Sequence, residues 1–162
     1  MKLIRSSIIV LLLTLSLFAC GRKSQPKPPE ERAPAPVREA KIEPRSSSLV
    51  LKWKAPIETA SGDEILYLDT FDVLRKVNRK NVSPDYREIA VINVKEDEVS
   101  DFEYQFEDRE VELGTVYEYL IVPRDGEGIE GVPQLSLRVS FLGAGSLVES
   151  IPFVVEGEED TK

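Results

Sequence analysis

Residues 102–123 read FEYQFEDREVELGTVYEYLIVP and carry the clearest strand pattern of the chain. Phe102, Tyr104 and Phe106 alternate with polar residues, which is the period-two pattern of a strand with one buried face. After a polar turn, residues 115–123 form a second apolar run of strand length. The stretch therefore predicts two short strands of a sheet whose neighbours are joined by turns.

The chain from Val37 onward repeats this pattern, and no stretch of it keeps a helical period. Apolar alternation predicts five further strands, which cover residues 40–42, 49–54, 69–77, 86–94 and 135–141. Seven short strands with one buried face each predict an all-β, immunoglobulin-like antiparallel sandwich.

Four segments of this body resemble the fibronectin type III family. LKWKAP at 51–56 fits the Leu-x-Trp-x-x-Pro pattern of its second strand, and FDVLR at 71–75 fits Tyr-x-Val-x-Arg with Phe for Tyr. Residues 106–117 fit Tyr-x-Asp-x-x-Leu-x-Pro-Gly-Thr-x-Tyr without a gap, with Phe106 for Tyr, Val111 for Leu and Leu113 for Pro. The loop 124–133 looks like the family's Gly-rich turn before the last strand. The resemblance covers roughly residues 36–142 and implies the seven-strand sandwich.

The resemblance also implies roles for particular residues. Trp53 is expected to fill the space between the two sheets, and the Tyr117 hydroxyl to bond to nearby backbone as a tyrosine corner. Leu113 stands where the family has Pro and is expected to keep a hydrophobic plug at that turn. Domains of this family act as spacers and as protein or glycan contact modules, so a non-catalytic binding or spacer module is the implied function.

Composition supports a non-enzymatic function. The 162 residues contain no His, which excludes His-based acid–base and nucleophilic catalysis and His-ligated metals. One Cys permits neither an intrachain disulfide nor a Cys cluster for a metal. A net charge of -8 disfavours nucleic acid as a partner. We therefore expect no enzymatic activity and no cofactor.

The first 19 residues have the features of a signal peptide. Lys2 and Arg5 precede an apolar run, Ile8 to Phe18, that is too short to span a bilayer comfortably. Leu17-Phe18-Ala19-Cys20 resembles the lipobox of bacterial lipoproteins. The resemblance implies cleavage before Cys20, acylation of that residue and anchoring in the bacterial cell envelope. Gly21 rather than Asp after the Cys resembles the pattern for export to the outer membrane.

Residues 20–36 are expected to form a lipidated, proline-rich tether. Five of the eleven prolines lie between residues 22 and 36, which disfavours both helix and central strand there. The start of the mature chain, CGRKS at 20–24, also looks somewhat like small envelope lipoproteins that assist lipopolysaccharide-transport assembly. An assembly factor is therefore an alternative function, and accessory glycan binding is a second one.

Two groups of charged residues are candidate sites. Residues 96–112 hold nine carboxylates, which favour a solvated face, with a calcium site or a glycosidase acid–base pair as alternatives. A basic patch is expected at the end of the third strand, close to the carboxylates of residues 107–110. It balances charge there or forms a docking surface for a protein partner, and it consists of Arg75, Lys76, Arg79 and Lys80.

The domain is expected to span residues 37–142, with a tail at 143–162. The tail contains an apolar segment, Ser150 to Val155, before an acidic end. This segment is either an added strand or a free partner-binding peptide. Because Pro152 interrupts a hydrogen-bond ladder, we expect the residues after it to pack back on the domain.

Overall fold

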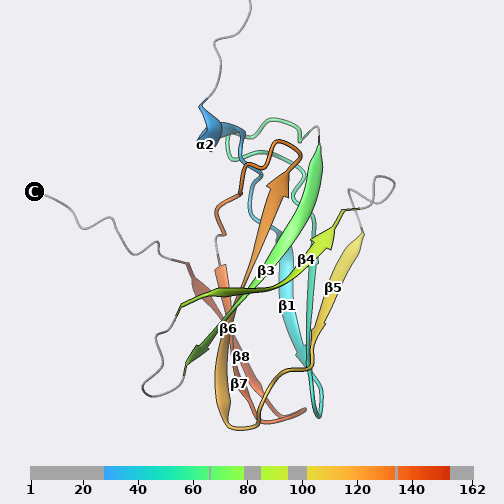
Figure 1. Cartoon of the computed structure of the whole chain (residues 1–162), viewed down its shortest axis with the longest axis vertical. Coiled ribbons are helices and arrows are strands. Elements are labelled where there is room, and N and C mark those ends of the chain that lie inside the picture. Colours follow the sequence, from blue (N-terminus) through green and yellow to red (C-terminus); the bar gives the residue numbers. More distant parts are fainter. Residues whose placement is uncertain (1–27, 66, 79–84, 95–101, 134, 154–162) are drawn as a thin grey trace, which may run out of the picture.

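The computed structural model describes residues 28–65, 67–78, 85–94, 102–133 and 135–153, and its strands form two antiparallel sheets that pack face to face (Figure 1). The smaller sheet has the strand order β1-β2-β5, with β1 at Arg38–Pro44, β2 at Leu49–Lys54 and β5 at Glu103–Asp108. The larger sheet has the order β4-β3-β6-β7-β8. Its strands are β3 (Leu68–Asn78), β4 (Arg87–Asn93), β6 (Thr115–Asp125), β7 (Leu135–Phe141) and β8 (Leu147–Pro152).

The core lies between the sheets and centres on Trp53, whose side chain is fully buried. Its ring meets Phe71 of the larger sheet edge-on at 5.5 Å and stacks on Tyr104 of its own sheet at 6.2 Å, measured between ring centroids. Such aromatic pairs add to the free energy of burial. Trp53 thus fills the space between the sheets, where the sequence places it.

All seven expected strands are present, each displaced by no more than two residues at either end of the expected range. The fold class expected from the alternation is confirmed. The residues in the core alternate with outward-facing ones along each strand, as in β6, where Tyr117, Tyr119 and Ile121 point inward.

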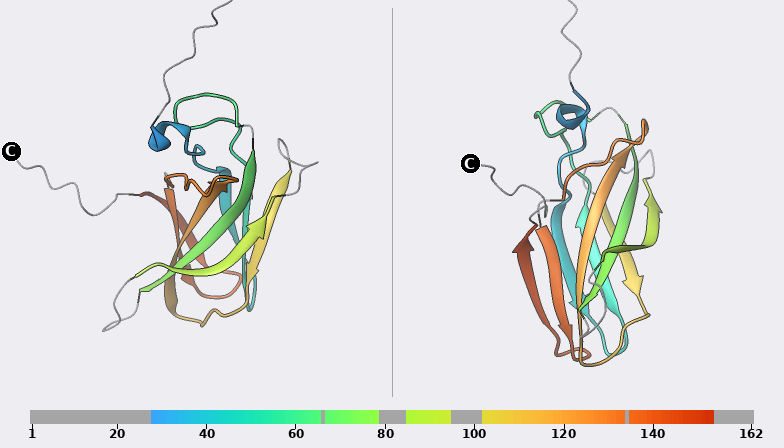
Figure 2. Two further views of the ribbon diagram at one scale, coloured as in Figure 1. Left: turned by 45° about the horizontal axis from the view of Figure 1, so that its top comes forward. Right: turned by 60° about the vertical axis from the view of Figure 1, so that its left-hand side comes forward.

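An eighth strand, β8, lies beside β7 at the edge of the larger sheet (Figure 2, right). The alternative of an added strand is confirmed, but the strand starts earlier than the expected segment 150–155: the ladder runs from Leu147 to Pro152 and ends with that proline opposite Leu135. Of the residues expected to pack back after Pro152, Phe153 lies 6.2 Å from Tyr86 between ring centroids, and the others lie outside the described residues. The reason for the early start is a reversal of the chain at Gly143, which has φ 74° and accepts a hydrogen bond from the Ser146 N–H at 3.1 Å. The strand therefore starts earlier than its apolar composition indicates.

Part of the expected tether packs on the domain. The helix α2 covers Pro29–Arg32, and Ala33 and Pro34 after it are buried. Backbone bonds fix this segment to the loop after β2: Ala60 N–H donates to Ala33 O at 2.8 Å, and Pro34 bridges to Thr59. A proline is tolerated at the first position of a helix because that N–H has no partner within the helix.

The expected absence of helix is thus wrong for residues 29–32, and the folded body starts near residue 29. Residues 20–27, including Cys20, lie outside the described residues. Within the part that is described, no helix is long and apolar enough to cross a membrane.

Candidate interaction surfaces

The sequence-predicted site residues divide into three groups. Cys20, Arg79 and Lys80 lie outside the described residues. Trp53 and Tyr117 belong to the core, and Arg75 and Lys76 lie on β3.

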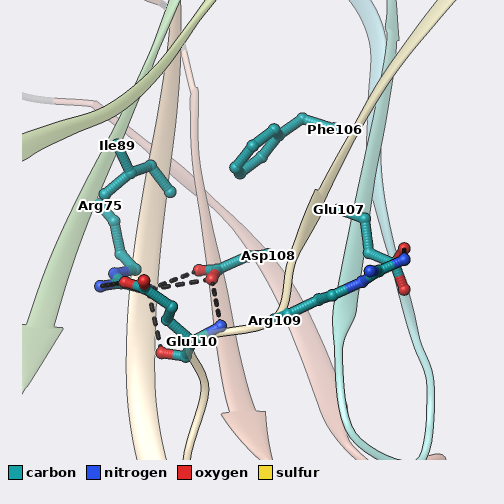
Figure 3. A pocket seen from close by; sticks show the side chains of 7 residues that line it. All are labelled: Arg75, Ile89, Phe106, Glu107, Asp108, Arg109 and Glu110. Atoms are coloured by element: carbon teal, nitrogen blue, oxygen red, sulfur yellow. Dashed lines mark hydrogen bonds and ion pairs between the residues drawn. The ribbon is translucent and has the colours of Figure 1, made fainter.

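Arg75 is part of a polar cluster that joins the two sheets (Figure 3). Its guanidinium donates to both carboxylate oxygens of Asp108 at 3.0 and 2.8 Å, and to the Glu110 carbonyl at 3.0 Å. The Tyr119 hydroxyl donates to the same carboxylate at 2.7 Å, and the Glu110 N–H donates to it at 2.9 Å. Because Asp108 ends β5 while Arg75 and Tyr119 lie on β3 and β6, this carboxylate is a clamp between the sheets.

The electrostatics of the clamp follow from its burial. Burial lowers the pKa of Arg75, but the hydrogen bond and charge of Asp108 outweigh it and raise that pKa above its ordinary value. Burial, together with the negative charge of Asp108, raises the pKa of Tyr119 far above its ordinary value. The tyrosine therefore stays protonated and continues to donate its hydrogen bond at any physiological pH.

A hollow of about 410 Å³ lies over this clamp, lined by Ile89, Phe106 and the charged residues from 107 to 110 (Figure 3). The carboxylate at its base is already bonded by an arginine, a tyrosine and a backbone N–H. Of the acidic cluster 96–112, residues 96–101 lie outside the described residues. Among the residues that the structure describes, no three acidic or Cys side chains are placed to hold a metal ion.

Two described members of the acidic cluster are engaged in ion pairs instead. Glu107 contacts Arg109 at 2.6 Å, and Glu103 contacts Lys41 at 3.1 Å. The hydrogen bonds from Arg109 and Ser48 lower the pKa of Glu107, so it is charged at neutral pH. This arrangement is that of a charge-balanced surface.

Lys76 belongs to a second polar cluster, on the outer face of the larger sheet. Its ammonium lies 3.5 Å from the carboxylate of Glu118, which is buried. Glu118 also accepts hydrogen bonds from Asn78 at 2.8 Å, Arg138 at 2.6 Å and the Tyr86 hydroxyl at 3.2 Å. Burial raises the pKa of Glu118, but its donors and neighbouring cations outweigh this effect and lower that pKa overall. Burial, and then the charge of Glu118, raise the pKa of Tyr86 to about 12.

The two described members of the expected basic patch therefore have partners within the domain. Arg75 and Lys76 are both ion-paired, at 2.8 and 3.5 Å from their acidic partners. The contacts of Arg75 with Asp108 and Glu110 are the charge balance that the sequence analysis gave as one of two alternatives. Docking of a protein partner on the basic patch stays a prediction. Sequence reasoning missed Glu118, whose signal is a charged residue inside the largely apolar run from Val116 to Pro123.

The Tyr117 hydroxyl accepts a hydrogen bond from the Glu112 N–H at 2.8 Å, which is the geometry of a tyrosine corner. The expectation for Leu113 is wrong, because its side chain is 69% exposed and plugs nothing. With Gly114 at φ 78°, the turn points that side chain outward.

An apolar cleft of about 550 Å³ lies where β1 and β7 begin, at the end of the domain that carries α2. Backbone irregularity at β1 accompanies it: the register shifts between Arg38 and Lys41, and Glu39 has φ 53°. The cleft is within the size range of ligand sites. The sequence analysis did not predict this cleft. In a sequence, the prolines that line it indicate only where strands end and not that they lie together around a hollow. Charged residues, Arg38, Glu39 and Glu58, also line it. Its apolar lining includes Pro36, Val37, Pro56, Ile121, Pro133 and Leu135.

No protein-family model and no curated protein sequence matches the chain. Among solved structures, a fibronectin type III domain derived from the human KIAA0970 protein is similar over 85% of this chain and 98% of its own, with a TM-score of 0.51 and 14% identity. The twitchin kinase region from C. elegans (Fn31-NL-kin-CRD-Ig26) is similar over 68% of this chain, with a TM-score of 0.51 and 17% identity. This chain spans 17% of the length of that twitchin region.

At these identities the likeness shows the fold alone. It agrees with the two-sheet architecture described above. The chain contains an all-β, immunoglobulin-like sandwich of the fibronectin type III kind.

Proposed function

We propose that this protein is a bacterial cell-envelope lipoprotein that holds a non-catalytic, fibronectin type III-like module close to the outer membrane. The fold itself supports a binding or spacer module. The observation that carries the anchor is the sequence around Cys20, in which the only cysteine of the chain follows a short apolar signal segment. Two or three acyl chains on one residue anchor a protein stably, whereas one chain does so marginally.

The packing of α2 sets how far the module reaches from the lipid. Because residues 31–35 are bonded to the loop after β2 and α2 begins at Pro29, only the segment between Cys20 and Pro28 separates the lipid from the folded body. In an extended polyproline conformation these eight steps reach about 25 Å, at roughly 3.1 Å per residue. In this proposal the module works near the membrane surface and not at the end of a long stalk.

A protein partner is part of the proposal. The apolar cleft at the start of β1 and β7 supports it better than the basic patch does, because the described part of that patch is engaged internally. The alternative of an envelope assembly factor rests on the sequence CGRKS at 20–24. Cross-linking in intact cells separates the two: recovery of lipopolysaccharide-transport components supports the assembly factor, and their absence supports a general binding module.

The anchor is tested by Cys20→Ala with Ser24→Ala as the matched control. Palmitate labelling and membrane fractionation are measured for both variants. We expect Cys20→Ala to lose the label and to accumulate as the uncut 162-residue precursor, while Ser24→Ala behaves as wild type. Labelling that persists in Cys20→Ala would refute the lipoprotein assignment.

A further inference from the structure

The edge strands of the sandwich differ in how they are protected against pairing with another chain. An edge strand leaves backbone N–H and C=O groups open, and natural proteins block such an edge with bulges or charged side chains. The edges here are β1 and β5 of the smaller sheet and β4 and β8 of the larger one.

The strands β1, β4 and β5 each carry such a device. The register of β1 with β2 shifts between Arg38 and Lys41, and that of β3 with β4 shifts between Val73 and Leu74, as at a bulge. Carboxylates occupy three of the six positions of β5, namely Glu103, Glu107 and Asp108. These strands are therefore poor templates for a further strand.

The strand β8, which is the outer strand of its sheet, is different (Figure 2, right). Its register with β7 is regular over six pairs. Glu149 is its only charged residue, and it lies opposite Arg138 of β7. Leu147 and Val148 are 68% and 38% exposed. The edge is therefore a regular and largely apolar template for pairing.

Pro152 indicates which backbone groups face the open edge of β8. A proline fits an edge strand where its nitrogen points away from the neighbouring strand. The direction of the backbone groups alternates along a strand, as do hydrogen-bonded and non-hydrogen-bonded pairs. Since Pro152 is paired with Leu135, the N–H groups of Ser150 and Val148 point to the open edge as well.

A second copy of the chain fits this edge through a two-fold axis perpendicular to the sheet. Such an axis keeps each face of the sheet on its own side, so directly opposed residues are both even or both odd in number. The two registers that pair most of the strand are centred on Glu149 and on Ser150. The first places two carboxylates directly opposite each other, which is destabilising. The second avoids this repulsion.

The register centred on Ser150 is complementary in side chains and in hydrogen bonds. It places Val148 opposite Pro152 of the second copy on the inner face of the sheet, and Leu147 opposite Phe153 on the outer face. The two Ser150 residues exchange hydrogen bonds, and each Val148 N–H donates to the Pro152 carbonyl of the other copy. Glu149 lies opposite Ile151 of the second copy and keeps its place beside Arg138 of its own sheet.

We propose that two copies of this protein pair through β8, with Ser150 at the two-fold axis, so that their larger sheets form one continuous sheet. A contact of this kind uses the same surface on both copies and closes as a dimer. The inference goes beyond the proposed function and does not rest on the lipid anchor. It leaves the apolar cleft to the protein partner, because the residues that line that cleft come from outside β8.

Cross-linking at the axis tests the pairing in the full-length protein. Ser150→Cys places two thiols on opposed residues, whose Cα atoms lie about 5.5 Å apart in a hydrogen-bonded pair, within the range of a disulfide. Glu88→Cys is the matched control, because Glu88 is exposed on β4, the other edge of the same sheet. Both variants and the wild type, which has Cys20 alone, are mildly oxidised in intact cells and separated on non-reducing gels.

We expect most chains of Ser150→Cys to migrate as a disulfide-linked dimer, and few chains of Glu88→Cys or of the wild type. Equal dimer formation at positions 150 and 88 would overturn the proposal, because it would reflect collisions alone. Absence of the Ser150→Cys dimer, or its linkage to a different protein instead, would also overturn it.

A charge on the edge gives a second measurement. Adding Val148→Lys to Ser150→Cys places a lysine of each copy against Pro152 of the other, and most of the dimer should be lost. Val91→Lys added to Ser150→Cys is the matched control, because Val91 is 47% exposed on β4 and the dimer should persist. Equal amounts of dimer in these two double variants would contradict pairing through β8.

Discussion

The ion pair between Arg75 and Asp108 offers the sharpest test of how the two sheets are held together. The Asp108 side chain is 4% exposed and that of Arg75 is 15% exposed, and their closest contact is 2.8 Å. Arg75→Met keeps most of the apolar stem but removes the cation and its bonds to Asp108 and to the Glu110 carbonyl. The carboxylate then remains buried with only its tyrosine and backbone donors.

Breaking a buried pair by removing one partner costs about 3–5 kcal/mol, because the remaining charge is uncompensated. Two hydrogen-bond donors remain on Asp108, so we expect the lower end, about 3 kcal/mol. The assay is urea unfolding followed by the fluorescence of Trp53, the only tryptophan and fully buried. The free energy of unfolding should fall while its dependence on urea stays constant.

Arg109→Met is the matched control. Arg109 pairs with Glu107 at 2.6 Å, but its side chain is 78% exposed, and exposed pairs contribute about 1 kcal/mol or less. An equal loss of stability in Arg75→Met and Arg109→Met would refute the clamp. A double-mutant cycle with Asp108→Asn should show a coupling energy between positions 75 and 108.

Three further predictions concern other parts of the fold. Tyr117→Phe leaves the Glu112 N–H without its acceptor and should lower the free energy of unfolding by about 1–2 kcal/mol; an unchanged value would contradict the tyrosine corner. The pKa of Tyr86 is raised from 10.0 to about 12, so its protonated form stabilises the fold below pH 10.0, and this contribution is lost as the pH rises through about 12. The difference in free energy of unfolding between wild type and Tyr86→Phe should therefore shrink over that alkaline range. A constant difference would contradict the raised pKa of Tyr86. Deleting residues 147–162 removes the β7–β8 ladder and should lower stability by about 2–4 kcal/mol in the same urea assay, with β-type circular dichroism retained; an unchanged midpoint would show that β8 contributes nothing.

The strands could be predicted from the sequence because each buries one face, and a half-buried strand alternates apolar and polar residues. Alternation placed Trp53 on the inner face of β2, and the structure finds it between the sheets. Glu112 and Tyr117 are five residues apart, in one turn and the strand that follows it. The local sequence pattern is therefore enough to predict the hydrogen bond of the tyrosine corner.

The remaining features depend on residues far apart in the chain. Glu118 is buried where Tyr86 and Arg138 bond to it, and no local pattern reveals those distant partners. The position of β8 depends on the reversal of the chain at Gly143. The apolar composition of the tail alone indicates a strand that starts later than the observed one. The docking of residues 29–34 depends on backbone bonds to the loop after β2, which composition cannot predict.

The mass and sequence of the mature N-terminus test the proposed function most directly. The protein is extracted from cell membranes with detergent, digested, and its first peptide is measured by mass spectrometry. We predict that the chain begins at Cys20 and that this residue carries two or three acyl chains. A mature chain that begins elsewhere, or a Cys20 with an unmodified thiol, would contradict the lipid-anchored module.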